Sequence, residues 1–279
     1  MSRMIVDSNA MQSEALRSFL NASSSNYAVL NDYAAMEAYK GNTLASIFRS
    51  MEIVCEFPRQ IIILKHTGHI CSLVGRTQGL QRRMIEERQT RDFPNFCRRL
   101  RAAQAGDKYI QRQLLENGRV ADDQMNRILT DAPILSGAIK ELRTTFRSEE
   151  LKAIRLDEPF PDSLIQKSMK FIVELTFLTM RTHPNPPSRI RNVKELQNTF
   201  LFRHAVSTFV WALDWVGRGG ADNVRADRMR NDVIDVIFAT YSTFFDGLLS
   251  SDEKAQRVYH GALFILSMLT RVQSIDVRR

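Results

Sequence analysis

The stretch NDVIDVIFATYSTFFDGLLSSDEKA, residues 231 to 255, places acidic residues inside a run of core-forming residues. Its apolar side chains at helical spacing predict a buried helix that ends at Gly247, a short buried strand at Leu248 and Leu249, and a last helix that begins at Asp252. A carboxylate removed from water costs several kcal/mol, as an order of magnitude, unless it is paired or holds a metal. The segment therefore needs a structural or a chemical explanation for its acids, which are Asp232, Asp235, Asp246 and Asp252.

The first 67 residues alternate between strand and helix patterns. Short β-branched or apolar runs predict strands at residues 4–6, 27–32 and 59–67, and helical spacing predicts helices at 13–20, 33–40 and 43–55. Asn31 or Asp32 can cap the second of these helices, and Gly41 can end it. An alternation of this kind predicts an α/β fold with a parallel sheet.

From about Gly68 the sequence becomes charged and helix-forming for some 120 residues, up to the breaker HPNPPS at 183–188. We expect an all-helical insertion over residues 68–189, with an α/β core formed by 1–67 and 190–279. Within the second part of the core, residues 195–220 predict one long helix that contains Trp211 and Trp215 and stops at the glycines that follow. We interpret the two tryptophans as packing residues.

Composition narrows the class of protein. The chain has 279 residues, 44% of them hydrophobic, which is enough for a substantial core. Cys55, Cys71 and Cys97 show no CxxC or Cys/His spacing, so we expect neither a zinc site nor a disulfide. The N-terminus lacks the apolar run of a signal peptide, and the longest apolar candidate, 61–64, is too short to cross a bilayer. We expect a cytoplasmic protein without a membrane partner.

Positive charge favours a polyanionic partner. Lys and Arg outnumber Asp and Glu by 39 to 31, for a net charge of +8 and a pI of about 9.6. One arginine-rich stretch covers residues 76–101, and another precedes Asp232. Either can serve as a phosphate-contacting surface or as a solvated face with local ion pairs, and the sequence leaves both interpretations open. The candidate nucleic-acid contacts are Arg82, Arg83, Arg98, Arg99, Arg225, Arg228 and Arg230.

Several acids stand where strands of a parallel sheet would end. Asp7 follows the first predicted strand and Asp252 follows the last, so both should lie at the carboxyl edge, where ligands bind in open α/β sheets. Each has an ordinary alternative: Asp7 as a turn residue, Asp252 within a capping box formed by Ser250 and Glu253. Glu37 lies in a helix among small residues that would let it pack close to the sheet, and it can equally be a surface charge.

Three pieces of the sequence resemble the PIN-like nuclease family. They are IVDSN at the start, VLNDYAAMEAYKG as a helix with an acid, and RNDVIDVIFATYSTFFDGLLSSDEKA near the end. The resemblance covers about the first 65 and the last 50 to 80 residues. It implies a PIN-like three-layer α/β/α fold with a central parallel sheet, while the large helical insertion departs from compact members of that family.

The resemblance also implies a metal-binding and catalytic set of four acids, Asp7, Glu37, Asp232 and Asp252. Asp235 is an additional metal-ligand candidate, and Asp246 is interpreted as a turn residue. Carboxylate-rich sites without nitrogen ligands suit Mg²⁺ or Mn²⁺, which can activate water for attack on a phosphodiester.

Two hypotheses about function follow. The first is a Mg²⁺- or Mn²⁺-dependent nuclease, with RNA favoured over DNA as the substrate and an endoribonuclease as the expected type. The second is a non-catalytic interaction or nucleic-acid-binding protein that uses the helical insertion as a docking surface. A regulatory protein partner and a homo-oligomer are left open under both.

Overall fold

Four parallel strands form the sheet of the computed structural model, which describes residues 1–279 except 42, 131, 157, 220–225 and 277–279. The strands are β1 (Ser2–Val6), β2 (Asn26–Leu30), β3 (Ile61–Ile63) and β4 (Gly247–Leu249), in the order β3-β2-β1-β4. Ile5 pairs with Val29 on one side and with Leu248 on the other. The expected α/β class with a parallel sheet is confirmed, including the short fourth strand.

The α-helices of the N-terminal part, unlike the short η1, begin where polar side chains cap them. They are η1 (Ala10–Gln12), α1 (Glu14–Ala22), α2 (Asp32–Tyr39) and α3 (Leu44–Glu56). Of the two proposed caps for α2, Asn31 is the one observed, because its side chain accepts a hydrogen bond from the Ala34 N–H at 2.8 Å. The Thr43 hydroxyl caps α3 in the same way, because it accepts a hydrogen bond from the Ser46 N–H.

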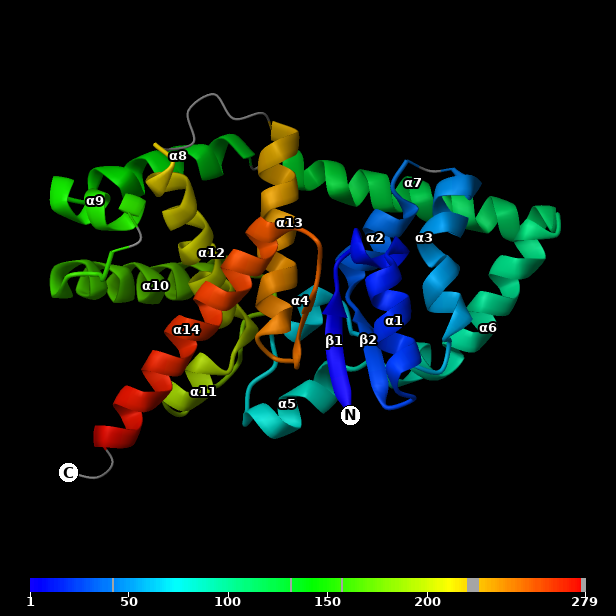
Figure 1. Ribbon diagram of the computed structural model, residues 1–279, viewed down its shortest axis with the longest axis horizontal. Helices are drawn as coiled ribbons and strands as arrows, with labels where there is room; N and C mark the ends of the chain where they lie inside the picture. Colours follow the sequence, from blue (N-terminus) through cyan, green and yellow to red (C-terminus); the bar gives the residue numbers. More distant parts are fainter. Residues whose placement is uncertain (42, 131, 157, 220–225, 277–279) are drawn as a thin grey trace.

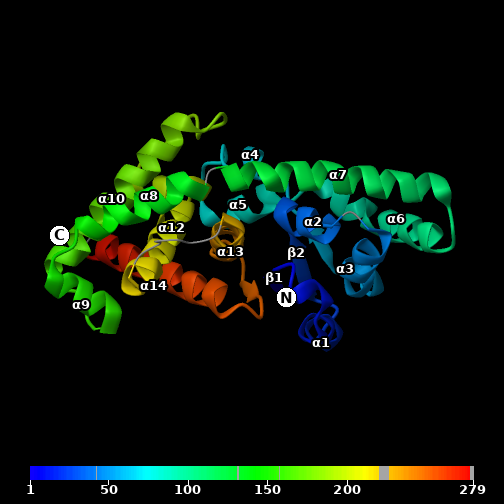
Figure 2. The same cartoon turned by 90° about the horizontal axis from the view of Figure 1, so that it is seen from above.

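The expected helical segment is helical over most of its described length. It contains α4 (Thr67–Ile70), α5 (Thr77–Met84), α6 (Glu87–Gln104), α7 (Lys108–Thr130), α8 (Ala132–Thr144), α9 (Ser148–Leu156) and α10 (Asp162–Thr182). The long α7 packs against α2, α3 and α13, whereas α8, α9 and α10 pack against α12. Figures 1 and 2 accordingly show α8, α9, α10 and α12 as a helical group beside the sheet, with α7 extending from it over α2.

The C-terminal part contains α11 (Val193–Gln197), α12 (Phe200–Gly217), α13 (Ala226–Ser242) and α14 (Glu253–Asp276). The prediction of one continuous helix from residue 195 to 220 is wrong, because Thr199 starts a new helix: its hydroxyl accepts from the Phe202 N–H at 3.2 Å. The tryptophans are buried as expected, with Trp211 only 2% exposed.

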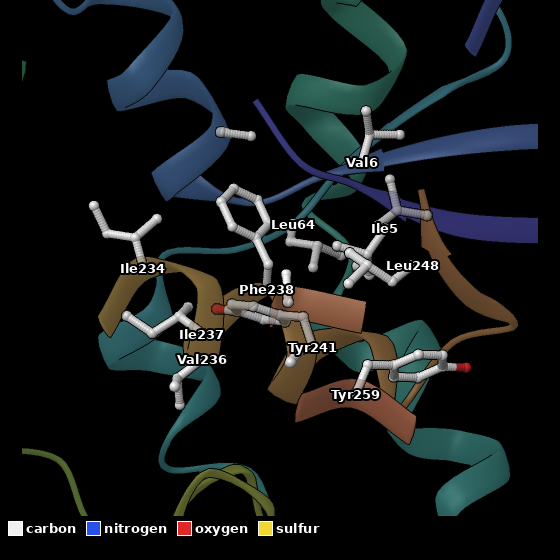
Figure 3. Close-up of a cluster of buried hydrophobic side chains, with 14 of the residues drawn as sticks. Ile5, Val6, Leu64, Ile234, Val236, Ile237, Phe238, Tyr241, Leu248 and Tyr259 are labelled. Atoms are coloured by element: carbon white, nitrogen blue, oxygen red, sulfur yellow. The ribbon is translucent and has the colours of Figure 1, made fainter. Parts of the chain in front are cut away.

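The core continues from the sheet into the helices. α13 packs against β1, β4 and α14, and its Phe238 and Tyr241 are fully buried. Figure 3 shows these side chains gathered with Ile5, Val6 and Leu248 of the sheet. Burial of a large apolar side chain contributes roughly 1.5–3 kcal/mol. This contact therefore fixes α13, and with it the acids of the opening stretch, against the sheet.

The expectation of no disulfide is wrong. Cys55 of α3 and Cys97 of α6 form a disulfide across 42 residues of sequence. The sequence offered no signal because the two cysteines are brought together by helix packing, not by a short spacing motif. A loop of this length implies a stabilisation of roughly 4 kcal/mol in the chain-entropy description. The remaining cysteine, Cys71, is buried and unpaired.

Over the described residues, no helix combines the length and the apolarity needed to cross a lipid bilayer.

Candidate acidic site

The strand order creates a place for a ligand. The chain proceeds from β1 to β2 and β3 on one side and returns on the other side of β1 as β4, so the order reverses between β1 and β4. In open parallel sheets, ligands bind at the carboxyl ends of the strands at such a reversal. Asp7 directly follows β1, and Ser250 directly follows β4.

Asp7 is held in place by hydroxyl groups from both ends of the chain. The Ser250 hydroxyl donates to Asp7 Oδ2 at 2.6 Å, and the Ser8 hydroxyl lies 3.3 Å from Asp7 Oδ1. The carboxylate belongs to a residue that is only 2% exposed. Hydrogen bonds to a buried carboxylate offset part of the cost of removing it from water.

Glu37 lies within reach of the same serine. The Ser8 hydroxyl also hydrogen-bonds to Glu37 Oε2, so Ser8 bridges the acid after β1 and the acid of α2. Burial raises the pKa of Glu37, while Ser8, Lys40 and Arg230 act in the opposite direction. The predicted proximity of Asp7 and Glu37 is therefore present.

Asp235 of α13 is the most perturbed acid of the group. Burial, followed by the charges of Asp252, Asp7 and Asp232, raises the pKa of Asp235 to about 8. A carboxyl group in such surroundings is neutral near pH 7, and a bound cation would favour its ionised form. Asp235, which the sequence offered only as an additional candidate, therefore lies in the field of the other acids.

Asp252 begins α14 and serves as its cap. Its Oδ1 accepts from the backbone N–H groups of Lys254 at 2.7 Å and Ala255 at 3.0 Å. The capping box expected between Ser250 and Glu253 is not formed, because Ser250 accepts from the Asp252 N–H and donates to Asp7 instead. The serine of the SSD sequence therefore joins the two acids at the ends of β1 and β4.

Asp232 has a different environment. Both indole N–H groups of α12 donate to its Oδ2, Trp211 at 3.2 Å and Trp215 at 2.9 Å. Its Oδ1 forms a buried ion pair with the Lys254 ammonium. Both oxygens are thus engaged by protein donors, an arrangement that favours a structural role. The metal-ligand role expected for Asp232 stays a prediction. Because protein donors already occupy both oxygens of Asp232, Asp235 is the better candidate for a metal ligand on α13.

Asn31 adds an unsatisfied donor to this edge of the sheet. β1 and β2 pair side by side, and Asp7 and Asn31 directly follow their carboxyl ends. Asn31 is 2% exposed; its side-chain oxygen caps α2, while its amide nitrogen has no hydrogen-bond partner among the described residues. Buried donors in native structures are almost always satisfied, so this one calls for an acceptor from outside the chain.

A small cavity lies next to Glu37. It has a volume of about 170 Å³ and is lined by Ser8, Asn9, Gln12, Glu37, Ala38, Lys40 and Ser50. In the part of the chain that the structure describes, no three His, Cys, Asp or Glu side chains already stand at ligand distances from a common point. Mutual repulsion keeps uncompensated carboxylates apart, so cation binding here requires them to move together.

The predicted arginine contacts do not form one surface with these acids. The charge of Arg230 acts to lower the pKa of Glu37. The Arg228 guanidinium lies over the Trp215 ring at 5.4 Å from its centroid, and Arg225 lies outside the described residues. Arg82 and Arg83 belong to α5, which Figure 1 shows near the start of β1, at the opposite end from Asp7. Arg98 and Arg99 belong to α6, which packs on β3 at the sheet edge away from β4.

Sequence reasoning overlooked four residues of the site, Ser8, Ser250, Lys254 and the amide of Asn31. The serines adjoin predicted acids, and that adjacency was an available signal. The sequence contains no such signal for Lys254, because its partner Asp232 is on another helix. A comparison with known protein families, with curated proteins and with solved structures finds no match for this chain.

The buried pair of Asp232 and Lys254 leads to a stability prediction. Lys254→Met leaves Asp232 buried without its cation, which should cost about 3–5 kcal/mol of unfolding free energy. The double variant Asp232→Asn/Lys254→Met removes both charges and should recover most of that loss. Urea unfolding at pH 7 measures both. A loss below about 1 kcal/mol in the single variant would contradict the assigned role.

Asp235 makes the stability of the metal-free protein dependent on pH. Because folding raises the pKa of Asp235 from its ordinary value of 3.8 to about 8, the folded state binds more protons between these values. Stability is therefore highest at the acid end of this window and falls as the pH rises through 8. Urea unfolding with a chelator at several pH values should show this slope, and Asp235→Asn should flatten it. An equal slope in both proteins would refute the assignment.

Proposed function

We propose that the protein is a Mg²⁺- or Mn²⁺-dependent nuclease, with RNA favoured over DNA. The observation that carries the proposal is the position of Asp7 and Asp252 at the strand-order reversal, where burial and their charges raise the pKa of Asp235 to about 8. Ser8 links Glu37 to the same Asp7. Strongly perturbed acids in one place are a mark of functional sites. The resemblance to PIN-like nucleases supports the choice of reaction.

The donor set suits a hard divalent cation. Asp7, Glu37, Asp235 and Asp252 supply carboxylate oxygens, and such oxygens with water are what Mg²⁺ and Mn²⁺ prefer. When bound, the cation would polarise the phosphodiester and lower the pKa of an attacking water. We assign the first contact to Asp7, because Ser250 and Ser8 already fix its carboxylate at the end of β1.

The remaining residues bind and orient the phosphate in this proposal. The Asn31 amide, buried and without an acceptor, would donate to a phosphate oxygen. Arg230 lies close enough to influence Glu37 and would contact the backbone of the nucleic acid. Lys254 remains paired with Asp232 and keeps the start of α14, and thus Asp252, in position.

A second candidate is a binding protein without catalysis that uses the helical segment for docking. Two observations favour it: the protein donors on both oxygens of Asp232, and the exposed apolar side chains of α10, among them Ile165, Phe177 and Leu178, each about half exposed. A binding protein of this kind does not require the acids to bind a cation, whereas the proposed nuclease does, so a metal-binding measurement distinguishes the two functions.

The nuclease proposal predicts a metal response that depends on two acids. Mn²⁺ should raise the thermal midpoint of the wild type, and Asp7→Asn or Asp235→Asn should lose that rise. The same variants should cleave single-stranded RNA at least on the order of 100-fold more slowly, given that even outer-shell residues of metal sites contribute 10- to 100-fold.

Asp246→Asn is the matched control, because Asp246 is exposed at the start of β4 and accepts from the Arg3 N–H. It should retain both the metal response and cleavage. If Mn²⁺ stabilises neither the wild type nor the control, and neither cleaves RNA or DNA, the binding protein becomes the better description.

Asn31 permits a separate test of phosphate recognition. Asn31→Ser keeps an oxygen that can cap α2 but removes the amide donor, so stability should change little while cleavage falls about tenfold or more, the value of one hydrogen bond to a charged group. Asn31→Ala should lower both. Thermal melts and single-turnover rates distinguish the two effects; unchanged rates in Asn31→Ser would exclude a role for the amide.

A further inference from the structure

The disulfide between Cys55 and Cys97 forms part of the wall of a surface cavity of about 500 Å³. Both cysteines contribute to the wall, together with Arg49, Glu52, Arg101 and Gln104. A cavity of this volume is in the range of small-molecule sites. It lies between α3 and α6, away from the strand-order reversal that holds the acids, so the proposed nuclease site does not account for it.

We propose that this cavity binds a small zwitterionic peptide thiol of the γ-glutamyl-cysteinyl-glycine kind, which exchanges with the Cys55–Cys97 disulfide. The inference is independent of the proposed nuclease activity. It rests on the position of the disulfide in the cavity wall and on the charges around it.

The charges of the cavity match such a ligand. A peptide thiol of this class carries two carboxylates and one ammonium group. Arg49 and Arg101 supply two guanidinium groups, and Glu52 supplies an exposed carboxylate. Glu56 also lines the cavity, but its carboxylate forms hydrogen bonds with Arg17 at 2.8 Å, so it is already neutralised. Guanidinium groups bind carboxylates in a planar, paired geometry.

Arg101 joins this arrangement directly to the disulfide. Its guanidinium donates to the backbone carbonyl of Cys55 at 3.0 Å. Arg101 and both cysteines line the same cavity, and a cation near reacting sulfurs favours the thiolate form of an incoming thiol and of the thiol that leaves. Within the described residues the exposed Arg49 side chain forms no hydrogen bond or ion pair, which leaves it available to a ligand.

The exchange balances without an added oxidant. Both cysteines are largely buried, Cys55 to 6% and Cys97 to 1% exposure, so the thiolate of the peptide reaches Cys55 Sγ from the cavity and forms a new S–S bond with it. The bond between Cys55 and Cys97 breaks, and its electron pair leaves with Cys97 as a thiolate. Attack by Cys97 on the mixed disulfide reverses the step and releases the peptide thiol.

The third cysteine does not interfere. Cys71 is buried, and burial raises its pKa to about 12, so it stays a protonated, unreactive thiol. The consequence of exchange is confined to α3 and α6, because their covalent link opens. α6 then stays on α3 and β3 through packing and through hydrogen bonds, among them those of Arg101 with Cys55 and of Thr90 with Ile63.

The test uses the full chain and reduced glutathione, with 2-mercaptoethanol as an uncharged thiol at the same thiolate concentration. Mass spectrometry after acid quenching should detect one glutathione on Cys55. Arg49→Ala should slow the reaction with glutathione about three- to fivefold, the size expected for an exposed ion pair, and leave the reaction with 2-mercaptoethanol unchanged. Arg88→Ala, at an exposed position of α6 outside the cavity wall, is the matched control and should slow neither.

Cys97→Ser provides a second measurement in which no disulfide has to open. Oxidised glutathione should label its free Cys55, again more slowly when Arg49 is replaced by Ala. The proposal is overturned if the denatured wild type shows three free thiols, if no mixed disulfide with Cys55 forms in either protein, or if Arg49→Ala slows both thiols equally.

Discussion

A single buried carboxylate organises the C-terminal half of the molecule. Asp232 receives two indole N–H groups from α12 and an ammonium from α14, while its own backbone belongs to α13. A charge without partners would not be tolerated there, so the three helices are constrained to one arrangement. That arrangement places Asp235 one turn further along α13 and sets the position of Asp252, two residues before the lysine. The geometry of the acidic site therefore depends on a neighbouring ion pair.

The parallel sheet supplies the other half of the geometry. Since β4 joins β1 on the side opposite β2, residues nearly 250 positions apart meet at one edge, and Ser250 reaches Asp7. No short-range sequence pattern predicts the contact between Asp7 and Ser250. The contact results from tertiary packing, in which the sheet and α13 bury Ile5, Val6, Phe238 and Tyr241 against one another.

Much of the framework was predictable because its signals are local. β-branched runs gave the strands, and Asn31 and Thr43 marked helix starts, since capping needs only residues three positions apart. The failures have mainly non-local causes. The disulfide, for example, joins cysteines on separate helices, whereas the break at Thr199 came from a local cap to Phe202 that the helical pattern of 195–220 concealed. In the site, the candidates Asp7, Glu37, Asp235 and Asp252 came from position, but the choice between Asp232 and Asp235 required knowing where Trp211, Trp215 and Lys254 lie.

The long helix α7 packs on α2, which carries Glu37, and on α13, which carries Asp235. Its Asn117 also hydrogen-bonds to Tyr39 at the end of α2. The distance between these two acids is therefore set partly by a third element that contributes no charge to them. α7 acts as a spacer, and its buried Leu114, Ala121 and Met125 determine how deeply it is seated. A substitution that enlarges or shortens one of these buried side chains would change the distance between Glu37 and Asp235, although the substituted residue contacts neither acid.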